Sequence, residues 1–223
     1  MVNYCGVEQG KRFARLVNYK DLGFTTVDEY EDYVEDMIKN VSRFIDSFCK
    51  RPDDFFNGGA TITEYHNGRP RRSSDFPDLY ADQKASRELR RTFYLEHYPI
   101  LAVPVPVVKE NVASIGSADD WKTRATTDYR LDTRNGLLKF SLAQTPDEGF
   151  KNVEVVYKAG FATTPAVVSW VCAEIIGNFL QAAVGDRSSQ WIQMARPTPF
   201  DFATPAIFTK EMERRLKPYV KRR

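Results

Sequence analysis

The sequence predicts an α+β fold, in which helices precede and follow an antiparallel β module. Three observations support this prediction. An amphipathic helix pattern covers residues 27–50, alternating β-formers and turn residues recur over residues 60–158, and a more apolar helix pattern covers residues 165–184. A third, short helix is expected near residues 209–217. We therefore predict a small helical bundle with an inserted β module and a C-terminal arm.

The first long helix is expected to begin at a capping box. The side chains of Thr26 and Glu29 can satisfy the backbone donors of a helix start, and apolar residues then recur every three or four positions as far as Cys49. Pro52 is expected to end this helix. The residues before it show weak periodicity, and a short strand or helical turn is expected at residues 16–23.

The β module is predicted from alternation and turn residues. Strands are expected at residues 60–65, 93–95, 100–108, 112–115, 129–134, 137–140 and 153–157. Asn135-Gly136 favours a tight hairpin, and the last strand is expected to pair with the second hairpin strand, which would complete a meander. Residues 69–91 interrupt the pattern as a polar and basic insertion, with a short helix expected near residues 81–91.

The second long helix is expected to follow Thr164 as its cap, with Pro165 at its first position. Its apolar stripe is broader than that of the first helix, so we expect it to be central to the core and packed against the first helix. On this pattern we divide the chain into a domain at residues 1–185 and an arm with a short helix at residues 186–223.

Composition excludes several classes of protein. The chain has 223 residues, of which 42% are hydrophobic and 28% charged, so it can bury a core and is not expected to be disordered. No apolar run approaches the roughly 20 residues of a membrane span, and the N-terminus lacks the apolar core of a signal peptide. We therefore expect a soluble protein, made in the cytoplasm, with no membrane contact. Cys5, Cys49 and Cys172 form no Cys-x-x-Cys pair, which argues against zinc and disulfide frameworks.

Motifs that would carry chemistry are weak. His66 and His97 have no metal ligands at suitable spacing, and the doublets Asp53-Asp54 and Asp119-Asp120 are better explained as solvated turns than as acid–base pairs. The sequence contains no phosphate-binding loop and no nucleophile elbow. We expect no catalytic, cofactor-binding or metal-binding residues, and an enzyme of unknown type is only a distant alternative.

Charge is distributed unevenly, although the net charge is only +2. Residues 28–51 carry seven acids and four bases, whereas residues 209–223 carry seven bases and two acids. Opposed charge suits head-to-tail contacts between copies, but it is equally common on ordinary surfaces. Three bases of the insertion, Arg69, Arg71 and Arg72, are candidates for non-specific contact with DNA in a channel or for contact with a neighbouring subunit.

Several pieces of the chain, in order, carry a resemblance to a known family. They are the helix ending Ile45-Asp-Ser-Phe-Cys-Lys-Arg, the strand at Ile62, the segment Phe93–Val103, the hairpin Tyr129–Phe140, the strand Val153–Ala159 with the following Gly-Phe-Ala-Thr-Thr-Pro, and the ending Leu216-Lys-Pro-Tyr219 with basic residues. The order is similar to that of the head–tail connector (adaptor) proteins of tailed bacteriophages. The insertion at residues 69–91 and the long segment 186–208 depart from the family pattern.

The resemblance implies a structural virion protein of the neck, between head and tail, made in the host cytoplasm. Its partners would be the portal protein, a stopper or tail protein, and itself in a ring of about twelve copies, held by heterologous interfaces. Such a ring extends the DNA channel. The alternative is another neck component, such as a stopper (head-closure) or tail-completion protein.

The C-terminal segment has two possible roles. Its short helix is too short to be stable alone, so it is expected to dock either on the portal or on its own domain. The resemblance favours the portal. The candidate portal-binding residues are Met212, Leu216, Lys217, Tyr219, Lys221, Arg222 and Arg223.

Overall fold

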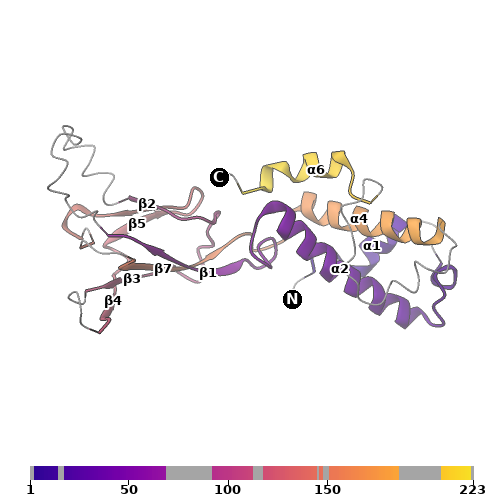
Figure 1. Ribbon diagram of the computed structural model, residues 1–223, viewed down its shortest axis with the longest axis horizontal. Coiled ribbons are helices and arrows are strands. Elements are labelled where there is room, and N and C mark those ends of the chain that lie inside the picture. Colours follow the sequence, from indigo (N-terminus) through magenta and orange to yellow (C-terminus); the bar gives the residue numbers. More distant parts are fainter. Residues whose placement is uncertain are drawn as a thin grey trace. The chain divides into compact units, whose positions relative to one another are not determined.

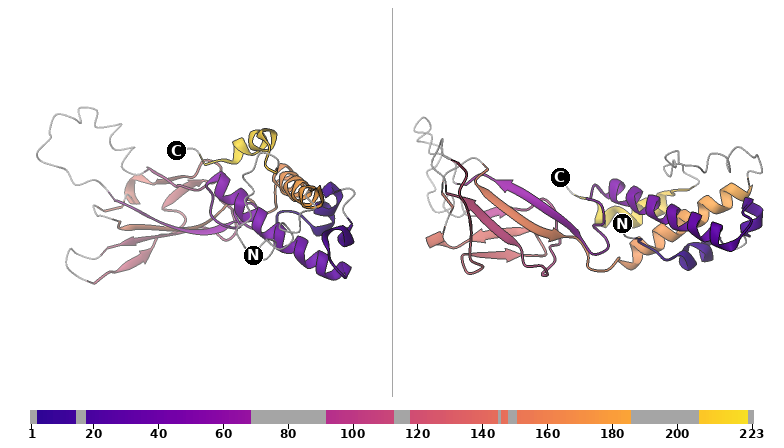
Figure 2. Two further views of the ribbon diagram at one scale, coloured as in Figure 1. Left: turned by 45° about the vertical axis from the view of Figure 1, so that its right-hand side comes forward. Right: turned by 90° about the horizontal axis from the view of Figure 1, so that it is seen from below.

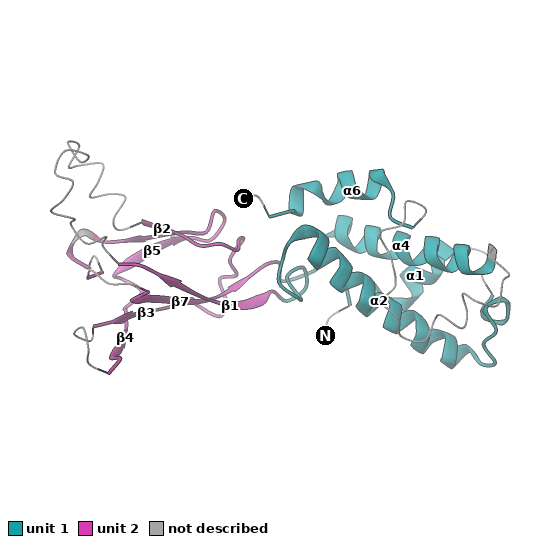
Figure 3. Cartoon of the chain, viewed as in Figure 1, with its two compact units in different colours: residues 1–58, 161–223 teal, residues 59–160 magenta. Residues whose placement is uncertain are grey.

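A computed structural model describes most of the chain, namely residues 3–14, 18–68, 92–112, 118–144, 146–147, 151–185 and 207–221. The chain forms two compact units (Figure 3): residues 1–58 together with 161–223, and residues 59–160. The first unit is helical and the second consists mainly of strands. The predicted α+β fold, with a β module inserted between two helices, is confirmed.

The helical unit contains short and long helices, labelled as in Figure 1. They are α1 (Val7–Ala14), the 3₁₀ helix η1 (Tyr19–Leu22), α2 (Val27–Cys49), α4 (Ala166–Gly185), α6 (Lys210–Leu216) and the 3₁₀ helix η4 (Lys217–Tyr219). Helix α4 contacts α1, α2 and α6, and these helices lie together in both views of Figure 2. The predicted packing of the two long helices is therefore confirmed, and α4 is the helix that the other three contact.

Helix α2 begins as its sequence predicts. The Thr26 hydroxyl accepts from the Glu29 N–H (3.2 Å), and the Glu29 carboxylate accepts in return from the Thr26 N–H (3.3 Å). It ends at Cys49, within one residue of the predicted end, and its last turn closes before Pro52 is reached. Lys50 adopts a left-handed conformation (φ 55°), and the Arg51 N–H donates to the Asp46 carbonyl (2.9 Å). This is the usual closure of a helix C-terminus.

Helix α1 packs closely on α4 through small residues and was missed by the periodicity of the sequence. Gly10 lies where an added Cβ would be 3.3 Å from Ile176, and Gly177 lies where an added Cβ would be 2.5 Å from the Cβ of Phe13. Because α1 is only eight residues long and its buried positions are Gly10 and Ala14, its apolar face is too short and too small to predict a helix from periodicity. The 3₁₀ turn η1 fits the helical turn that was one of the two expectations for residues 16–23.

The close approach of α1 to α4 predicts the sign of one substitution. Replacing a glycine by alanine in a helix interior normally stabilises the helix by about 1 kcal/mol. In Gly177→Ala, however, the added methyl group would overlap Phe13. Such overpacking costs about 1–3 kcal/mol. We expect a net loss of stability in urea unfolding followed by circular dichroism. Gly6→Ala is the control, because nothing lies within 4 Å of its added Cβ. A variant Gly177→Ala more stable than the wild type would contradict this packing.

Helix α4 begins within one residue of its predicted start, and the Ser169 N–H donates to the Pro165 carbonyl (3.0 Å). Its segment Ala166–Val184 has 19 residues and a mean hydropathy of 1.5, which is long and apolar enough to cross a membrane. The expectation that no apolar run approaches this length was wrong. Half of the segment is buried inside the protein, and a core helix of this kind passes the same test.

The described residues of the β unit form two antiparallel sheets. One has the strand order β1 (Ala60–His66), β7 (Val153–Ala159), β3 (Val107–Asn111) and β4 (Trp121–Thr123). The other has the order β2 (Thr92–Tyr94), β6 (Leu137–Phe140) and β5 (Tyr129–Asp132). Side chains of both sheets are buried, and the ring of Phe93 in the second sheet lies 5.4 Å from that of His66 in the first.

The predicted meander was wrong, because β7 pairs with β1 and β3 whereas β6 pairs with β2 and β5. Strand β7 is seven residues long, as is β1, and every second side chain of β7 is buried. A strand of this length is better matched by β1 along its whole edge than by the four-residue β6. Alternation alone predicts a half-buried strand but does not select its neighbours.

The hairpin of β5 and β6 is confirmed, but its turn is longer than expected. Asp132 pairs with Leu137, so four residues form the loop. The Asp132 carboxylate accepts from the N–H groups of Arg134 (3.0 Å) and Asn135 (3.2 Å), and Gly136 alone takes a positive φ (66°). These hydrogen bonds stabilise the four-residue loop in place of the two-residue primed turn.

Proline accounts for the shortening of one predicted strand. Of residues 100–108, only the last two belong to β3, and Ile100 makes an isolated bridge to Ala159. Pro104 and Pro106 have no N–H to donate to a ladder. Val112 lies just beyond β3, while residues 113–115 and the predicted helix at residues 81–91 lie outside the described residues.

Candidate functional site

The C-terminal helix α6 is the candidate site that the sequence analysis singled out. It begins at Thr209, whose hydroxyl accepts from the Met212 N–H (3.3 Å). Met212 and Leu216 share one face of α6 and are both 0% exposed. Lys210, Arg214 and Lys217 are exposed. The helix is therefore amphipathic in its docked position, with its apolar face already covered.

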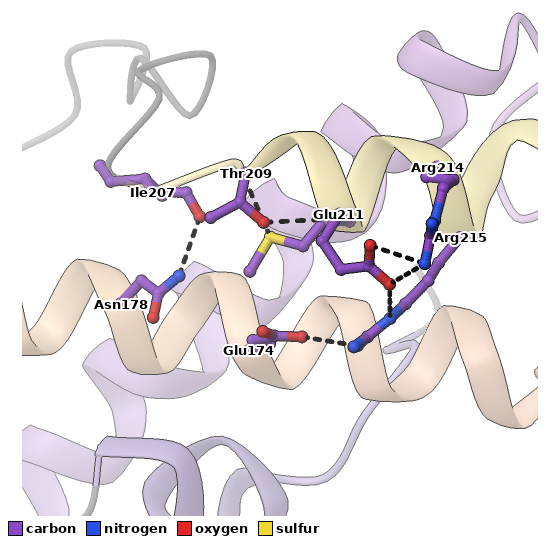
Figure 4. Close-up of polar contacts among 8 residues, drawn as sticks. Glu174, Asn178, Ile207, Thr209, Glu211, Arg214 and Arg215 are labelled. Carbon is purple, nitrogen blue, oxygen red and sulfur yellow. Dashed lines mark hydrogen bonds and ion pairs between the residues drawn. The ribbon is translucent and has the colours of Figure 1, made fainter.

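Polar contacts surround this packing (Figure 4). Arg215 bridges α6 and α4, since its guanidinium contacts Glu174 (3.1 Å) as well as Glu211 (3.2 Å) on its own helix. The Asn178 side chain of α4 donates to the Ile207 carbonyl (3.2 Å) just before α6. Such exposed ion pairs contribute at most about 1 kcal/mol each, so burial of the apolar face is the larger stabilising term.

The residues after α6 are also held by the helical unit. The ring of Tyr219 lies 5.7 Å from Phe56 and 5.9 Å from Phe161. The Arg51 Nε–H donates to the Tyr219 carbonyl (3.1 Å), and the Lys221 N–H donates to the Cys49 carbonyl (2.9 Å). The chain is therefore fixed to its own core as far as Lys221.

The described part of the C-terminal segment packs on its own unit, which is one of the two dockings expected for the short helix. Met212 and Leu216 cannot contact a portal in this conformation, and Tyr219 is half-buried. Lys217 is exposed and Lys221 is half-buried. The remaining predicted site residues lie outside the described residues: Arg69, Arg71, Arg72, Arg222 and Arg223. A stripe of this spacing predicts that the helix is covered but does not identify what covers it.

Apolar side chains that the sequence analysis did not select are exposed on both units. In the β unit, Val103 and Val105 are 80% and 60% exposed on either side of Pro104. In the helical unit, Trp170 of α4 is 57% exposed, with one edge against Phe13 (5.6 Å between ring centroids). The valine–proline run was a detectable signal, since its prolines cannot donate to a ladder and so keep this segment out of the interior of a sheet.

Asp46, which is buried on α2, is a carboxylate whose pKa is strongly perturbed by its surroundings. The Tyr4 hydroxyl lies 2.6 Å from each of its carboxylate oxygens, and the Asp54 N–H donates to it as well (3.2 Å). Burial raises the pKa of Asp46 to about 7, although these hydrogen bonds oppose the rise. A pKa near neutrality is typical of general acids and bases, but the contacts of Asp46 are with the N-terminal segment and the loop after α2. These hydrogen bonds join α2 to the N-terminal segment and to the loop after α2.

Two further polar clusters stabilise the β unit. Glu64 accepts from the Tyr157 hydroxyl and from the Glu96 N–H (2.9 Å), and His66 lies 3.2 Å from it. Burial alone would raise the pKa of Glu64, but these hydrogen bonds lower it below its usual value.

Glu110 forms the other cluster. It is buried, pairs with Arg124 and accepts from the Asp147 N–H (2.6 Å), so it fixes a loop to β3. In both clusters the carboxylate binds backbone N–H groups of its own unit, which is a structural role.

The aspartate doublets weighed for chemistry make local hydrogen bonds within their own units. Asp119 and Asp120 are exposed and hydrogen-bond Asn111, as expected of a turn, while Asp54 donates its N–H to Asp46. Within the described ranges, no three His, Cys, Asp or Glu side chains are grouped so that they could hold a metal ion.

Comparison with known proteins adds no relative. No protein-family model, curated protein or solved structure matches the chain.

Proposed function

We propose that this chain is a structural protein of the virion neck, a head–tail connector that joins the portal to a stopper or tail protein. The observation that carries the proposal is that both compact units expose large apolar side chains. Isolated exposed apolar residues are ordinary, but neighbouring ones such as Val103 and Val105 are typical of protein–protein contacts. The order of helix, inserted β unit and apolar helix supports the same assignment, because it resembles the adaptor family.

Self-assembly into a ring is part of this proposal. A ring of identical subunits needs two different surfaces on each subunit, one for each neighbour. The valine–proline segment of the β unit and the Trp170 surface of α4 are two such unlike apolar surfaces. The ring would enclose a channel for DNA.

Contact with the portal is assigned to the outer face of α6. Residues 210–221 carry five bases and two acids. The exposed bases Lys210, Arg214 and Lys217 are free of the packing that buries Met212 and Leu216, so they are available to an acidic partner surface. An interaction of exposed charges weakens as salt rises.

The test is binding to the portal protein encoded by the same viral genome, followed by light scattering and titration. The wild-type chain is expected to be taken up by the portal, with lower affinity at higher salt. The triple variant Lys210→Glu, Arg214→Glu, Lys217→Glu should bind at least about tenfold more weakly, about 1.4 kcal/mol.

The matched control reverses three exposed bases of the β unit, Lys122→Glu, Arg130→Glu and Arg134→Glu, with the same change in net charge. It should bind the portal as the wild type does. No uptake of the wild type would contradict the connector proposal. Normal binding by the α6 variant would instead contradict only the assignment of this face.

A further inference from the structure

Two of the three cysteines lie side by side in the helical unit, although they are far apart in the sequence. The Sγ of Cys5, in the segment before α1, is 3.5 Å from the Sγ of Cys172 on α4. Both are free thiols, and the two residues are 6% and 0% exposed. The spacing of the cysteines in the sequence gave no indication of this pair.

We propose that Cys5 and Cys172 form a cross-linking site, which a two-electron oxidant such as hydrogen peroxide converts into an intrachain disulfide. A disulfide has an S–S length of about 2.05 Å, so the two sulfur atoms need to approach by only about 1.5 Å. This inference is independent of the proposed function.

The surroundings of Cys5 keep the two thiols together. The neighbouring Tyr4 is anchored twice to α2, because its N–H donates to the Ser42 hydroxyl (3.2 Å) and its own hydroxyl contacts Asp46 (2.6 Å). On the other side, Gly6 is exposed and has nothing within 4 Å of an added Cβ. The segment is therefore held next to α4 on one side and has room to adjust on the other.

The chemistry proceeds in two displacements. The Cys5 thiolate attacks one peroxide oxygen, hydroxide leaves and takes a proton to become water, and Cys5 becomes a sulfenic acid. The Cys172 sulfur then attacks the Cys5 sulfur, the S–S bond forms, and the departing hydroxide takes the Cys172 proton to become a second water. Two thiols lose two electrons in total, and one peroxide is reduced to two waters.

The order of these steps follows from accessibility and ionisation. Cys5 is the more exposed residue of the two and lies next to the exposed Gly6, so we expect peroxide to reach it first. Burial, together with the hydrogen bond from Cys5, raises the pKa of Cys172 well above its usual value, which keeps Cys172 in its unreactive thiol form until Cys5 is oxidised. Burial likewise raises the pKa of Cys49, to about 12, so Cys49 is expected to stay reduced.

The test uses the full chain under native conditions, with and without hydrogen peroxide, followed by unfolding, alkylation of the remaining thiols and peptide mass spectrometry. We expect a cross-linked peptide pair containing Cys5 and Cys172, lighter than the sum of the two by about 2 Da, with Cys49 alkylated. The urea midpoint of the oxidised chain should rise and return to its original value after reduction, because the disulfide closes a long loop.

The variant Cys49→Ser should give the same cross-link, whereas Cys5→Ser should give none. Alkylation of both Cys5 and Cys172 after oxidation would overturn the proposal, as would oxidation of Cys5 that ends at the sulfinic acid, or pairing of either residue with Cys49. The wild-type measurement alone gives each of these outcomes, so a variant that fails to fold does not prevent the test.

Discussion

Leu216→Ala is expected to lower the free energy of unfolding by about 2–5 kcal/mol, the usual cost of removing a fully buried leucine side chain. Leu216 is 0% exposed and belongs to the apolar face with which α6 packs in the helical unit. The lost stability has two parts: the favourable free energy of burying the removed side-chain atoms, and the cost of the cavity that they leave behind. Urea unfolding followed by circular dichroism measures it. Met212→Ala should cost a similar amount, because Met212 is equally buried on the same face.

The matched control is Arg214→Ala, which removes an exposed side chain from the same helix and should change stability by no more than about 0.5 kcal/mol. If Leu216→Ala behaved like this control, α6 would not be docked in the free protein. The short helix would then be available as an arm. Deleting residues 209–223 is a less clear test of portal binding, because the deletion would also uncover the part of the core that Met212 and Leu216 fill.

The wild-type protein is expected to lose stability relative to Asp46→Asn as the pH rises from about 4 to about 7. Burial raises the pKa of Asp46 to about 7 in the folded protein, against about 3.9 in an unfolded chain. Between these values the folded state keeps a proton that the unfolded state has released, so unfolding becomes more favourable as the pH rises. Above pH 7 Asp46 is ionised in both the folded and the unfolded chain. The loss of unfolding free energy relative to Asp46→Asn then stays constant, at a few kcal/mol at most.

The measurement is the urea-unfolding free energy of both proteins over this pH range. Carboxylates whose pKa is lowered by folding, such as Glu64, contribute an opposite slope, which cancels when the variant is subtracted from the wild type. Tyr4→Phe is the second comparison. It removes the hydroxyl whose hydrogen bond lowers the pKa of Asp46, so this pKa should rise further. The pH range over which stability falls should therefore extend to higher pH. Parallel pH profiles for the wild type and Asp46→Asn would show that Asp46 ionises normally in the fold.

Elements whose signals are local could be predicted from the sequence. The capping box of Thr26 and Glu29, the apolar stripe of α2 and the cap at Thr209 all depend on residues within a few positions of one another, and each helix start was correct to within a residue. Helix α1 gives only a weak signal, because it is eight residues long and its buried positions are a glycine and an alanine. The neighbours of β7 depend on pairings more than forty residues away, which alternation does not specify.

The candidate site could be predicted only in part. The spacing of Met212 and Leu216 correctly indicates that one face of α6 is covered, but a helix that docks on its own core and one that docks on a partner need the same stripe. The buried ion pair of Glu110 and Arg124 and the contact of Cys5 with Cys172 join residues distant in the sequence, and the fold alone brings them together.

The location of this protein in virions encoded by the same genome tests the central claim most directly. Electron cryo-microscopy of purified virions, with the helical unit and the β unit fitted separately into the density, gives that location. The connector proposal predicts a ring of copies directly beneath the portal, with the outer face of α6 toward it. Density one ring lower, as for a stopper, or the absence of the protein from intact virions would contradict the proposal.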